Sequence, residues 1–124
     1  MATPVILIVD DDVNLLKLLS RLLGVLEADV IMANGGAQAL DVLDEEVPDL
    51  LLLDLAMPGV RGEDVLEHVR SDPRFDTMKV MILTARPNAL QAAVAVGVDD
   101  WMAKPISHDE FLEKVRWLLA DFYL

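Results

Sequence analysis

The sequence predicts a doubly wound α/β domain in which five helices flank a five-stranded parallel sheet. Short, continuous apolar runs recur at residues 5–9, 30–33, 50–53, 80–83 and 101–103. Such runs are typical of strands that are buried on both faces, and stretches with helical spacing separate them. Five strand–helix units joined by right-handed crossovers form an open sheet, whereas a closed α/β barrel needs eight such units.

Each apolar run is followed by a stretch in which apolar residues recur at helical spacing. In the first stretch, Leu15, Leu19 and Leu22 lie on one face of the expected helix. The five predicted helices cover residues 14–26, 37–46, 63–70, 88–96 and 107–122. Strands and helices therefore alternate along almost the whole chain.

Local signals mark three of the helix ends. Asp12 precedes the first helix and is expected to cap its N-terminus. Ser107 and Glu110 have the spacing of a capping box at the start of the last helix. Gly97 follows the fourth helix, at a position where glycine commonly ends helices. Between these elements, residues 71–78 form the longest irregular connection.

The length and charge of the chain limit its function. Its 124 residues suit one domain, so we expect residues 1–124 to form a single domain with no output domain. It has no cysteine, which excludes thiol chemistry and cysteine-ligated zinc. Its 22 acidic and 10 basic residues give a formal net charge of −12, which repels nucleic acids and anionic membranes. No apolar run approaches the ~20 residues of a membrane span. We therefore expect a cytoplasmic domain that binds neither nucleic acid nor membranes directly.

Polar side chains stand at the ends of four predicted strands. Asp10 and Asp11 follow the first strand, and Asp54 follows the third. Thr84 ends the fourth strand, and Lys104 follows the fifth. Because ligands of open α/β sheets bind outside the carboxyl ends of the strands, we expect these side chains to meet at one rim.

This set of side chains suits phosphoryl chemistry. Neighbouring carboxylates repel each other, by ~4 kcal/mol for two unit charges about 4 Å apart at an effective dielectric constant of about 20. An all-oxygen set of ligands favours Mg²⁺, which keeps coordination positions for phosphate oxygens. A carboxylate such as Asp54 can attack phosphorus and form an acyl phosphate, with Asp10 and Asp11 holding the metal. Lys104 would neutralise the phosphoryl oxygens, and Thr84 would donate a hydrogen bond to one of them.

Four motifs in this order resemble the receiver domain of two-component response regulators. They are Val9-Asp10-Asp11-Asp12, Leu53-Asp54-Leu55-Ala56-Met57-Pro58-Gly59, Thr84-Ala85 and Lys104-Pro105, and the resemblance spans nearly the whole chain. It implies a flavodoxin-like fold with strand order 2-1-3-4-5. It also implies that Asp54 accepts a phosphoryl group from a histidine kinase or a histidine phosphotransfer protein. The domain would then be a signalling switch and not an enzyme that turns over an external substrate.

The resemblance implies a ligand set for the metal. Asp10, Asp11, Asp54 and the backbone carbonyl of Ala56 would hold Mg²⁺, with Mn²⁺ as a substitute. Lys104 would pair with the phosphoryl group, and its peptide bond to Pro105 would be cis.

The resemblance also implies residues that act after phosphorylation. Thr84 would move toward the phosphoryl group, and Trp101 would rotate inward behind it. Ala56 and Arg86 stand at the two positions that set the lifetime of the phosphoryl group in this family. Ala56 has no side chain to position an attacking water, and Arg86 is expected to shield the phosphorus. We therefore expect a long-lived phosphoryl group.

Plainer interpretations of several residues stay open at this stage. Residues 10–12 are also typical of a solvated turn before a helix. Trp101 is as compatible with a fixed core or partner-facing position as with a switch. His68 and His108 have no paired ligand or nucleophile and are expected on the surface. Gly35-Gly36 favours a turn over a phosphate-binding loop.

Two other classes of function compete with the signalling switch. A Mg²⁺-dependent phosphatase or phosphotransferase would use Asp54 as a nucleophile in repeated turnover. Such enzymes commonly need a second acid two residues further on, where this chain has Ala56. A degenerate receiver that acts only as a scaffold does not need the polar residues that remain intact at the strand ends.

One face of the domain is unusually apolar for a surface. Residues 89–96 contain a single polar side chain, Gln91, and Trp117 lies off the apolar stripe of the last helix. We expect the face formed by residues 88–96, 101–103 and 107–122 to bind a downstream protein or a second copy of the domain. Ala92 and Trp117 are the positions on which this prediction depends.

Overall fold

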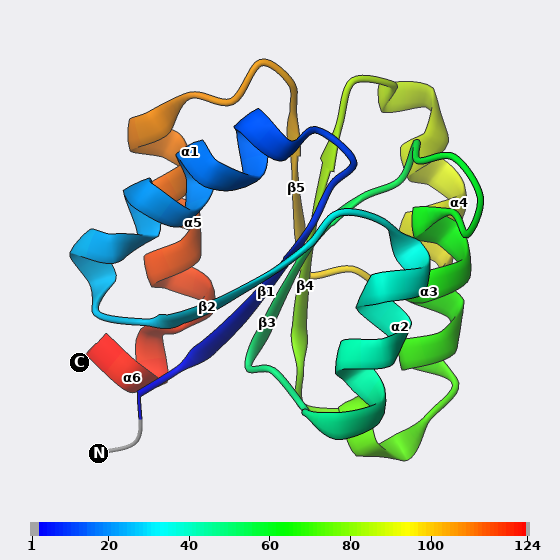
Figure 1. Ribbon diagram of the computed structural model, residues 1–124, viewed down its shortest axis with the longest axis horizontal. Helices are drawn as coiled ribbons and strands as arrows, with labels where there is room; N and C mark the ends of the chain where they lie inside the picture. Colours follow the sequence, from blue (N-terminus) through cyan, green and yellow to red (C-terminus); the bar gives the residue numbers. More distant parts are fainter. Residues whose placement is uncertain (1–2, 124) are drawn as a thin grey trace.

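A computed structural model describes residues 3–123 as a parallel sheet of five strands between two layers of helices (Figure 1). The strands are β1 (Val5–Val9), β2 (Asp29–Ala33), β3 (Leu50–Asp54), β4 (Lys79–Thr84) and β5 (Asp100–Ala103). They lie in the order β2-β1-β3-β4-β5, with every neighbouring pair parallel. The predicted fold and strand order are confirmed.

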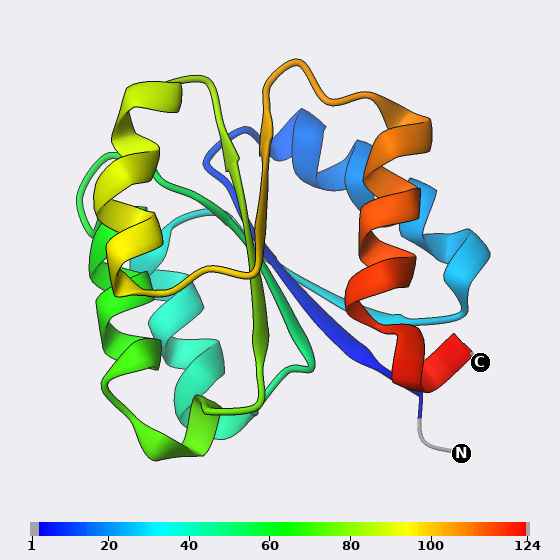
Figure 2. The same ribbon diagram turned by 180° about the vertical axis from the view of Figure 1, so that it is seen from behind.

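The helices divide into two layers (Figures 1 and 2). Helices α1 and α5 cover one face of the sheet, and α2, α3 and α4 cover the other. Their bounds are α1 (Val13–Leu23), α2 (Gly36–Glu45), α3 (Gly62–Arg70), α4 (Leu90–Val96) and α5 (His108–Leu118), followed by the short α6 (Ala120–Tyr123). None of the helices between residues 3 and 123 combines the length and the apolar character needed to cross a bilayer.

The apolar runs of β1, β3 and β4 form strands that are buried on both faces, as the sequence predicts, whereas the prediction is wrong for β2 and β5, which are only partly buried. In β1, Ile6 and Ile8 pack under α1 and α5, whereas Leu7 and Val9 pack under the opposite layer. All five residues of β3 are buried. Strands β2 and β5 are the edges of the sheet, which leaves Trp101 of β5 44% exposed. The core therefore consists of two apolar clusters separated by the central strands.

Three predicted helices differ from the structure by more than one residue at an end. The helix predicted over 14–26 ends at Leu23 and continues as a 3₁₀ turn, η1 (Gly24–Leu26). The helix predicted over 88–96 begins as a 3₁₀ turn, η3 (Pro87–Ala89), and becomes α-helical at Leu90. The helix predicted over 107–122 is interrupted at Leu119, whose φ of −106° and ψ of 27° leave helical geometry.

Two of the three predicted helix-end signals are confirmed. The Asp12 carboxylate accepts a hydrogen bond from the amide of Leu15 at 3.2 Å and caps α1. Gly97 ends α4 with a φ of 120°, in the left-handed region where a residue with a Cβ is disfavoured. The prediction of a capping box at Ser107 is wrong, because the Ser107 side chain makes no capping hydrogen bond.

Two arginines anchor the connection over residues 71–78, which contains the 3₁₀ turn η2 (Pro73–Phe75). Arg70 donates to the carbonyls of Gly97 and Met78 and pairs with Asp99 at 3.2 Å. Arg74 donates to the carbonyl of Leu43 at the end of α2. This connection therefore joins α2, α3 and the turn before β5.

The two histidines differ in their surroundings. His108 is exposed, as predicted. The predicted surface position of His68 holds only in part, because His68 is half-buried and its Nε2 atom is enclosed. Its ring lies 6.3 Å from that of Phe75, which fills the space below α3.

Candidate functional site

The carboxyl ends of β1, β3 and β5 bring two aspartates and a lysine together, at the top of Figure 1. The Nζ atom of Lys104 lies 2.6 Å from Oδ2 of Asp10 and 3.5 Å from Oδ2 of Asp54. Asp10 is fully buried, and Asp54 is only 3% exposed. The strands are parallel, so β1, β3 and β5 end at the same edge of the sheet, and Asp10 and Lys104 meet there although they are 94 residues apart in the chain.

Each buried aspartate is oriented by the backbone that follows it. Asp10 accepts a hydrogen bond from the amide of Asp12 at 2.9 Å through its Oδ1 atom. Asp54 accepts one from the amide of Ala56 at 3.2 Å, also through Oδ1. In both residues the Oδ2 atom is the one that lies near Lys104. The two carboxylates are therefore held in place before any ligand arrives.

Three carboxylates of the rim form a set that suits a hard cation. Oxygen atoms of Asp10, Asp11 and Asp54 lie within 4.8 Å of one another, and Asp11 is exposed. One lysine neutralises only part of this charge, and every side-chain donor in the set is an oxygen. This composition fits Mg²⁺, which prefers carboxylate and water oxygens.

Burial raises the pKa of the Asp54 carboxyl above its ordinary value, and the negative charge of Asp10 adds to this effect. Lys104 and the Ala56 amide act in the opposite direction but do not cancel it. For Lys104, burial alone would lower the pKa, but the hydrogen bond and charge of Asp10 outweigh it and leave the pKa raised. Lys104 therefore stays positively charged. Its charge only partly offsets the effects of burial and of Asp10 on the Asp54 carboxyl.

The raised pKa of Asp54 makes the stability of the metal-free fold depend on pH. A carboxyl with a raised folded-state pKa favours folding below its ordinary value of 3.8, and this contribution is lost as the pH rises through the folded-state pKa. We therefore expect Asp54→Asn to unfold at a higher urea concentration than the wild type at pH 7 in EDTA. The difference should shrink as the pH falls toward about 4. An Asp54→Asn variant that is less stable than the wild type at pH 7 contradicts this expectation.

The two predicted switch residues lie on the paired strands β4 and β5. Thr84 is buried at the end of β4, and its hydroxyl is hydrogen-bonded to the backbone of Arg86. The carbonyl of Thr84 accepts a hydrogen bond from the amide of Lys104 at 2.8 Å. The exposed Trp101 lies at the edge of the sheet. Their movement after phosphorylation stays a prediction.

The other residues of the predicted site are found at the same rim. The backbone amide of Ala56 contacts the Asp54 carboxylate, and Arg86 is exposed after β4. The peptide bond between Lys104 and Pro105 is cis, in agreement with the resemblance. The proposed effects of Ala56 and Arg86 on the lifetime of a phosphoryl group stay predictions.

Two glycines that sequence reasoning did not assign to the site hold the loop after Asp54. A Cβ atom on Gly62 would collide with the Asp54 carbonyl oxygen and lie 2.6 Å from the Leu55 Cα atom. A Cβ atom on Gly36 would collide with the Val60 carbonyl and lie 2.7 Å from its Cγ1 atom. The glycines themselves were visible in the sequence, but the close approach of the loop to α2 and β3 is a tertiary feature.

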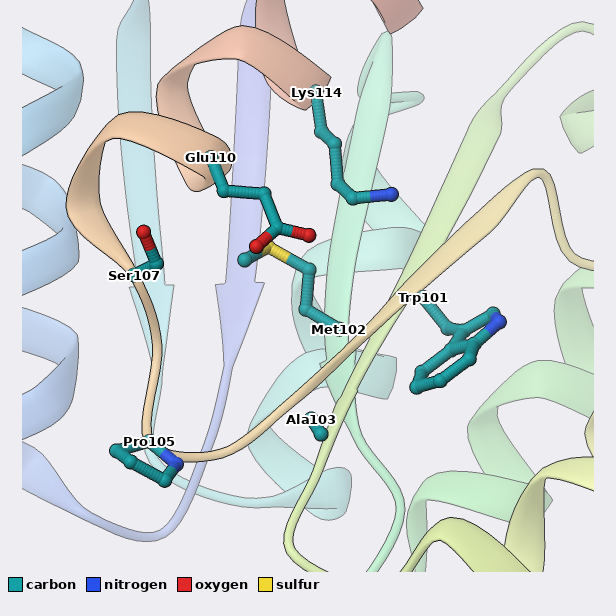
Figure 3. A pocket seen from close by; sticks show the side chains of 7 residues that line it. All are labelled: Trp101, Met102, Ala103, Pro105, Ser107, Glu110 and Lys114. Atoms are coloured by element: carbon teal, nitrogen blue, oxygen red, sulfur yellow. The ribbon is translucent and has the colours of Figure 1, made fainter.

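The apolar face predicted for partner binding is exposed. Ala92 is exposed on α4, and Trp117 is 78% exposed on α5. Within this face lies a hollow of about 350 Å³, shown in Figure 3, whose lining includes none of Asp10, Asp11 and Asp54. In that view Glu110 and Lys114 extend from α5, while Trp101 points to the other side of β5. The hollow is therefore separate from the rim that holds Asp54.

The chain is similar to response regulators over almost its whole length. The sequence profile of the response regulator receiver domain matches residues 6–116. The transcriptional regulatory protein CpxR of Escherichia coli (strain K12) is 40% identical over 116 residues, which are 92% of this chain and 48% of CpxR. The response regulator MprA of Mycobacterium avium (strain 104) is 36% identical, over 92% of this chain and 50% of MprA. The chain thus spans about half the length of these relatives.

Solved structures share the fold. The response regulator TrrA from Thermotoga maritima, in complex with Mg²⁺ and beryllofluoride, matches with a TM-score of 0.83 and 30% identity over 94% of this chain and 99% of TrrA. A CheY-like response regulator receiver domain protein from Methanospirillum hungatei matches with a TM-score of 0.88 and 26% identity, over 97% of this chain and 96% of that one. By profile, relatives and fold, the chain belongs to the response regulator receiver domain family of two-component systems.

Proposed function

We propose that this domain is a phosphorylation-controlled switch in which Asp54 accepts a phosphoryl group from a histidine kinase or a histidine phosphotransfer protein. The observation that carries the proposal is the position of the Lys104 ammonium, 2.6 Å from Asp10 and 3.5 Å from Asp54. It leaves a buried aspartate with a cation on one side and two further carboxylates nearby. The lysine lowers the cost of bringing an anionic phosphoryl group to an anionic nucleophile, and the further carboxylates provide ligands for a cation that lowers it again.

The residues of the rim divide the work of the transfer. An oxygen of Asp54 forms a bond to phosphorus while the P–N bond of the donor phosphohistidine breaks, and the electron pair of that bond returns to the imidazole nitrogen. Lys104 neutralises charge on the phosphoryl oxygens throughout. Asp10, Asp11, Asp54 and the carbonyl of Ala56 would hold Mg²⁺, which supplies charge neutralisation and orientation when bound. TrrA, crystallised with Mg²⁺ and beryllofluoride, supports this assignment of the metal.

The output of the switch is a change in population between two surfaces. A phosphoryl group on Asp54 offers the Thr84 hydroxyl a charged acceptor, which favours movement of Thr84 toward it and of Trp101 behind it. The face formed by residues 88–96, 101–103 and 107–122 then binds a downstream protein or a second copy of the domain. Ala92 and Trp117 are exposed on this face, which supports the assignment.

A turnover enzyme is the weaker alternative. It would need a general acid to protonate a leaving group beside Asp54, and the residue two positions further on is Ala56. The domain therefore carries out only the transfer and hydrolysis of its own phosphoryl group.

Intact-mass spectrometry after incubation with Mg²⁺ and acetyl phosphate tests the proposed function. We expect one phosphoryl adduct in the wild type, none in Asp54→Asn, and the normal adduct in Asp41→Asn, an exposed control on α2. Repeated turnover of acetyl phosphate without a stable adduct would favour the enzyme. An adduct that persists in Asp54→Asn contradicts the proposal.

The lifetime of the adduct tests the role of Ala56. An asparagine at this position can hydrogen-bond a water near the phosphorus, which alanine cannot do. We therefore expect Ala56→Asn to lose its phosphoryl group several times faster than the wild type, as followed by intact mass over time. Slower loss in Ala56→Asn contradicts this prediction.

A further inference from the structure

The backbone of Arg86 holds the Thr84 hydroxyl in its present position. The hydroxyl accepts a hydrogen bond from the Arg86 amide at 2.9 Å and donates one to the Arg86 carbonyl at 3.3 Å. A hydroxyl has a single proton, so Thr84 cannot donate fully to a phosphoryl oxygen while it donates to this carbonyl. Arg86 and a phosphoryl group on Asp54 therefore compete for the same proton.

The conformation of Arg86 is restricted by the residue that follows it. Pro87 opens η3, and a residue before proline is disfavoured in the helical region. Arg86 has a φ of −123° and a ψ of 85°, outside that region. Its carbonyl also accepts a hydrogen bond from the Ala89 amide at 3.0 Å, within the turn that Pro87 begins. Both Arg86 groups that bind Thr84 are thus fixed by this local geometry.

The carbonyl of Arg86 keeps a hydrogen-bond partner when the Thr84 hydroxyl moves away. The Ala89 hydrogen bond remains, and Arg86 is exposed, so water can reach its amide. Release of the Thr84 hydroxyl therefore costs little free energy. A modest change in the backbone conformation that Arg86 prefers is then enough to change the population in which the hydroxyl is released.

We infer that Pro87 is a positioning residue that holds the Thr84 hydroxyl on Arg86 and so opposes its transfer to the phosphoryl group. This inference rests on the proposed function of Asp54. Without Pro87, Arg86 can enter the helical region, where its amide and carbonyl no longer both point at Thr84. The population with a released hydroxyl then increases, and an anion on Asp54 binds this population better.

Pro87→Ala tests the inference, with Pro73→Ala as a matched control. Pro73 also opens a 3₁₀ turn and also follows an extended residue, Asp72 with a φ of −112° and a ψ of 118°. It lies before β4, at the other end of the sheet from Asp54. Both prolines are exposed, so neither substitution opens a cavity.

The first measurement needs no phosphodonor. Amide hydrogen exchange at Arg86, followed by NMR, should be about two- to fivefold faster in Pro87→Ala than in the wild type, the size of one proline restriction. Pro73→Ala should leave Arg86 unchanged. Unchanged exchange at Arg86 in Pro87→Ala would overturn the inference.

The second measurement is the affinity for beryllofluoride in the presence of Mg²⁺. We expect Pro87→Ala to bind about two- to fivefold more tightly than the wild type, and to lose this gain in a Thr84→Val background, which lacks the hydroxyl. A gain that persists in Thr84→Val, or weaker binding in Pro87→Ala, would overturn the inference. Failure of the wild type to bind beryllofluoride would instead contradict the proposed function. The two failures can be told apart, because the exchange measurement does not depend on beryllofluoride binding.

Discussion

Lys104→Met is expected to lower the free energy of unfolding by about 3 kcal/mol at pH 7 in EDTA. The Asp10 carboxylate is fully buried, and its hydrogen bond with Lys104 is 2.6 Å long. Methionine has a similar length but no charge, so Asp10 and Asp54 remain close together without a cation. Loss of one partner of a buried pair costs about 3–5 kcal/mol, and the 21% exposure of the Lys104 side chain places the expected loss at the lower end.

Urea unfolding measures this loss, and two conditions make the result specific. Mg²⁺ should restore part of the stability of Lys104→Met, because a cation held by the same carboxylates replaces the missing charge. Acidification should also reduce the difference in stability between Lys104→Met and the wild type, since protonation of Asp10 or Asp54 removes the repulsion between the two carboxylates. Lys17→Met, an exposed control on α1, should change stability by less than about 0.5 kcal/mol. A Lys104→Met protein that is as stable as the wild type at pH 7 without metal would contradict the pairing described here.

Lys104→Met should also accept phosphoryl groups much more slowly than the wild type, because the ammonium that neutralises the phosphoryl oxygens is gone. We expect a loss of at least tenfold in the rate of adduct formation from acetyl phosphate. The measurement should be made under conditions in which the variant is folded, so that loss of structure does not mimic loss of chemistry.

The position of Lys104 relative to Asp54 is the part of the site that the sequence predicted best. Parallel strands present their carboxyl ends at one edge, so residues that end the strands meet whatever their separation in the chain. The continuous run before Asp54 is typical of a central strand that is buried on both faces, and β3 is such a strand. Fold class and rim therefore follow from the order of elements, which the sequence displays directly.

Features that depend on close approach between elements were not predicted. The enclosure of His68 beside Phe75 requires knowledge of how residues 71–78 fold back under α3. The interruption of the last helix at Leu119 leaves Leu118 and Leu119 both buried, which helical spacing alone does not indicate. The bonds between Thr84 and Arg86 depend on backbone angles before a proline. In the first two cases tertiary packing decides among local options that the sequence leaves open, and in the third the local backbone geometry before Pro87 does.

Gly62→Ala is the substitution that tests such a close approach most directly. In an exposed helix, alanine in place of glycine normally stabilises by about 1 kcal/mol. At Gly62 the added Cβ atom would lie 2.6 Å from the Leu55 Cα atom and 2.8 Å from the Asp54 carbonyl carbon. These neighbours are backbone atoms, so the start of α3 and the end of β3 must move apart. We therefore expect a loss of about 3 kcal/mol in the free energy of unfolding, in the range for overpacked sites.

The same displacement should affect chemistry, because the Asp54 carbonyl belongs to the residue that carries the nucleophile. We expect Gly62→Ala to form the phosphoryl adduct at least tenfold more slowly than the wild type under conditions where both are folded. Gly24→Ala is the matched control: Gly24 has a φ of −55°, and a Cβ atom there meets nothing within 4 Å. That variant should be neutral or more stable by about 0.4–1 kcal/mol, with normal phosphorylation. If Gly62→Ala behaves like Gly24→Ala in both measurements, the loop after Asp54 does not depend on the contact with Gly62.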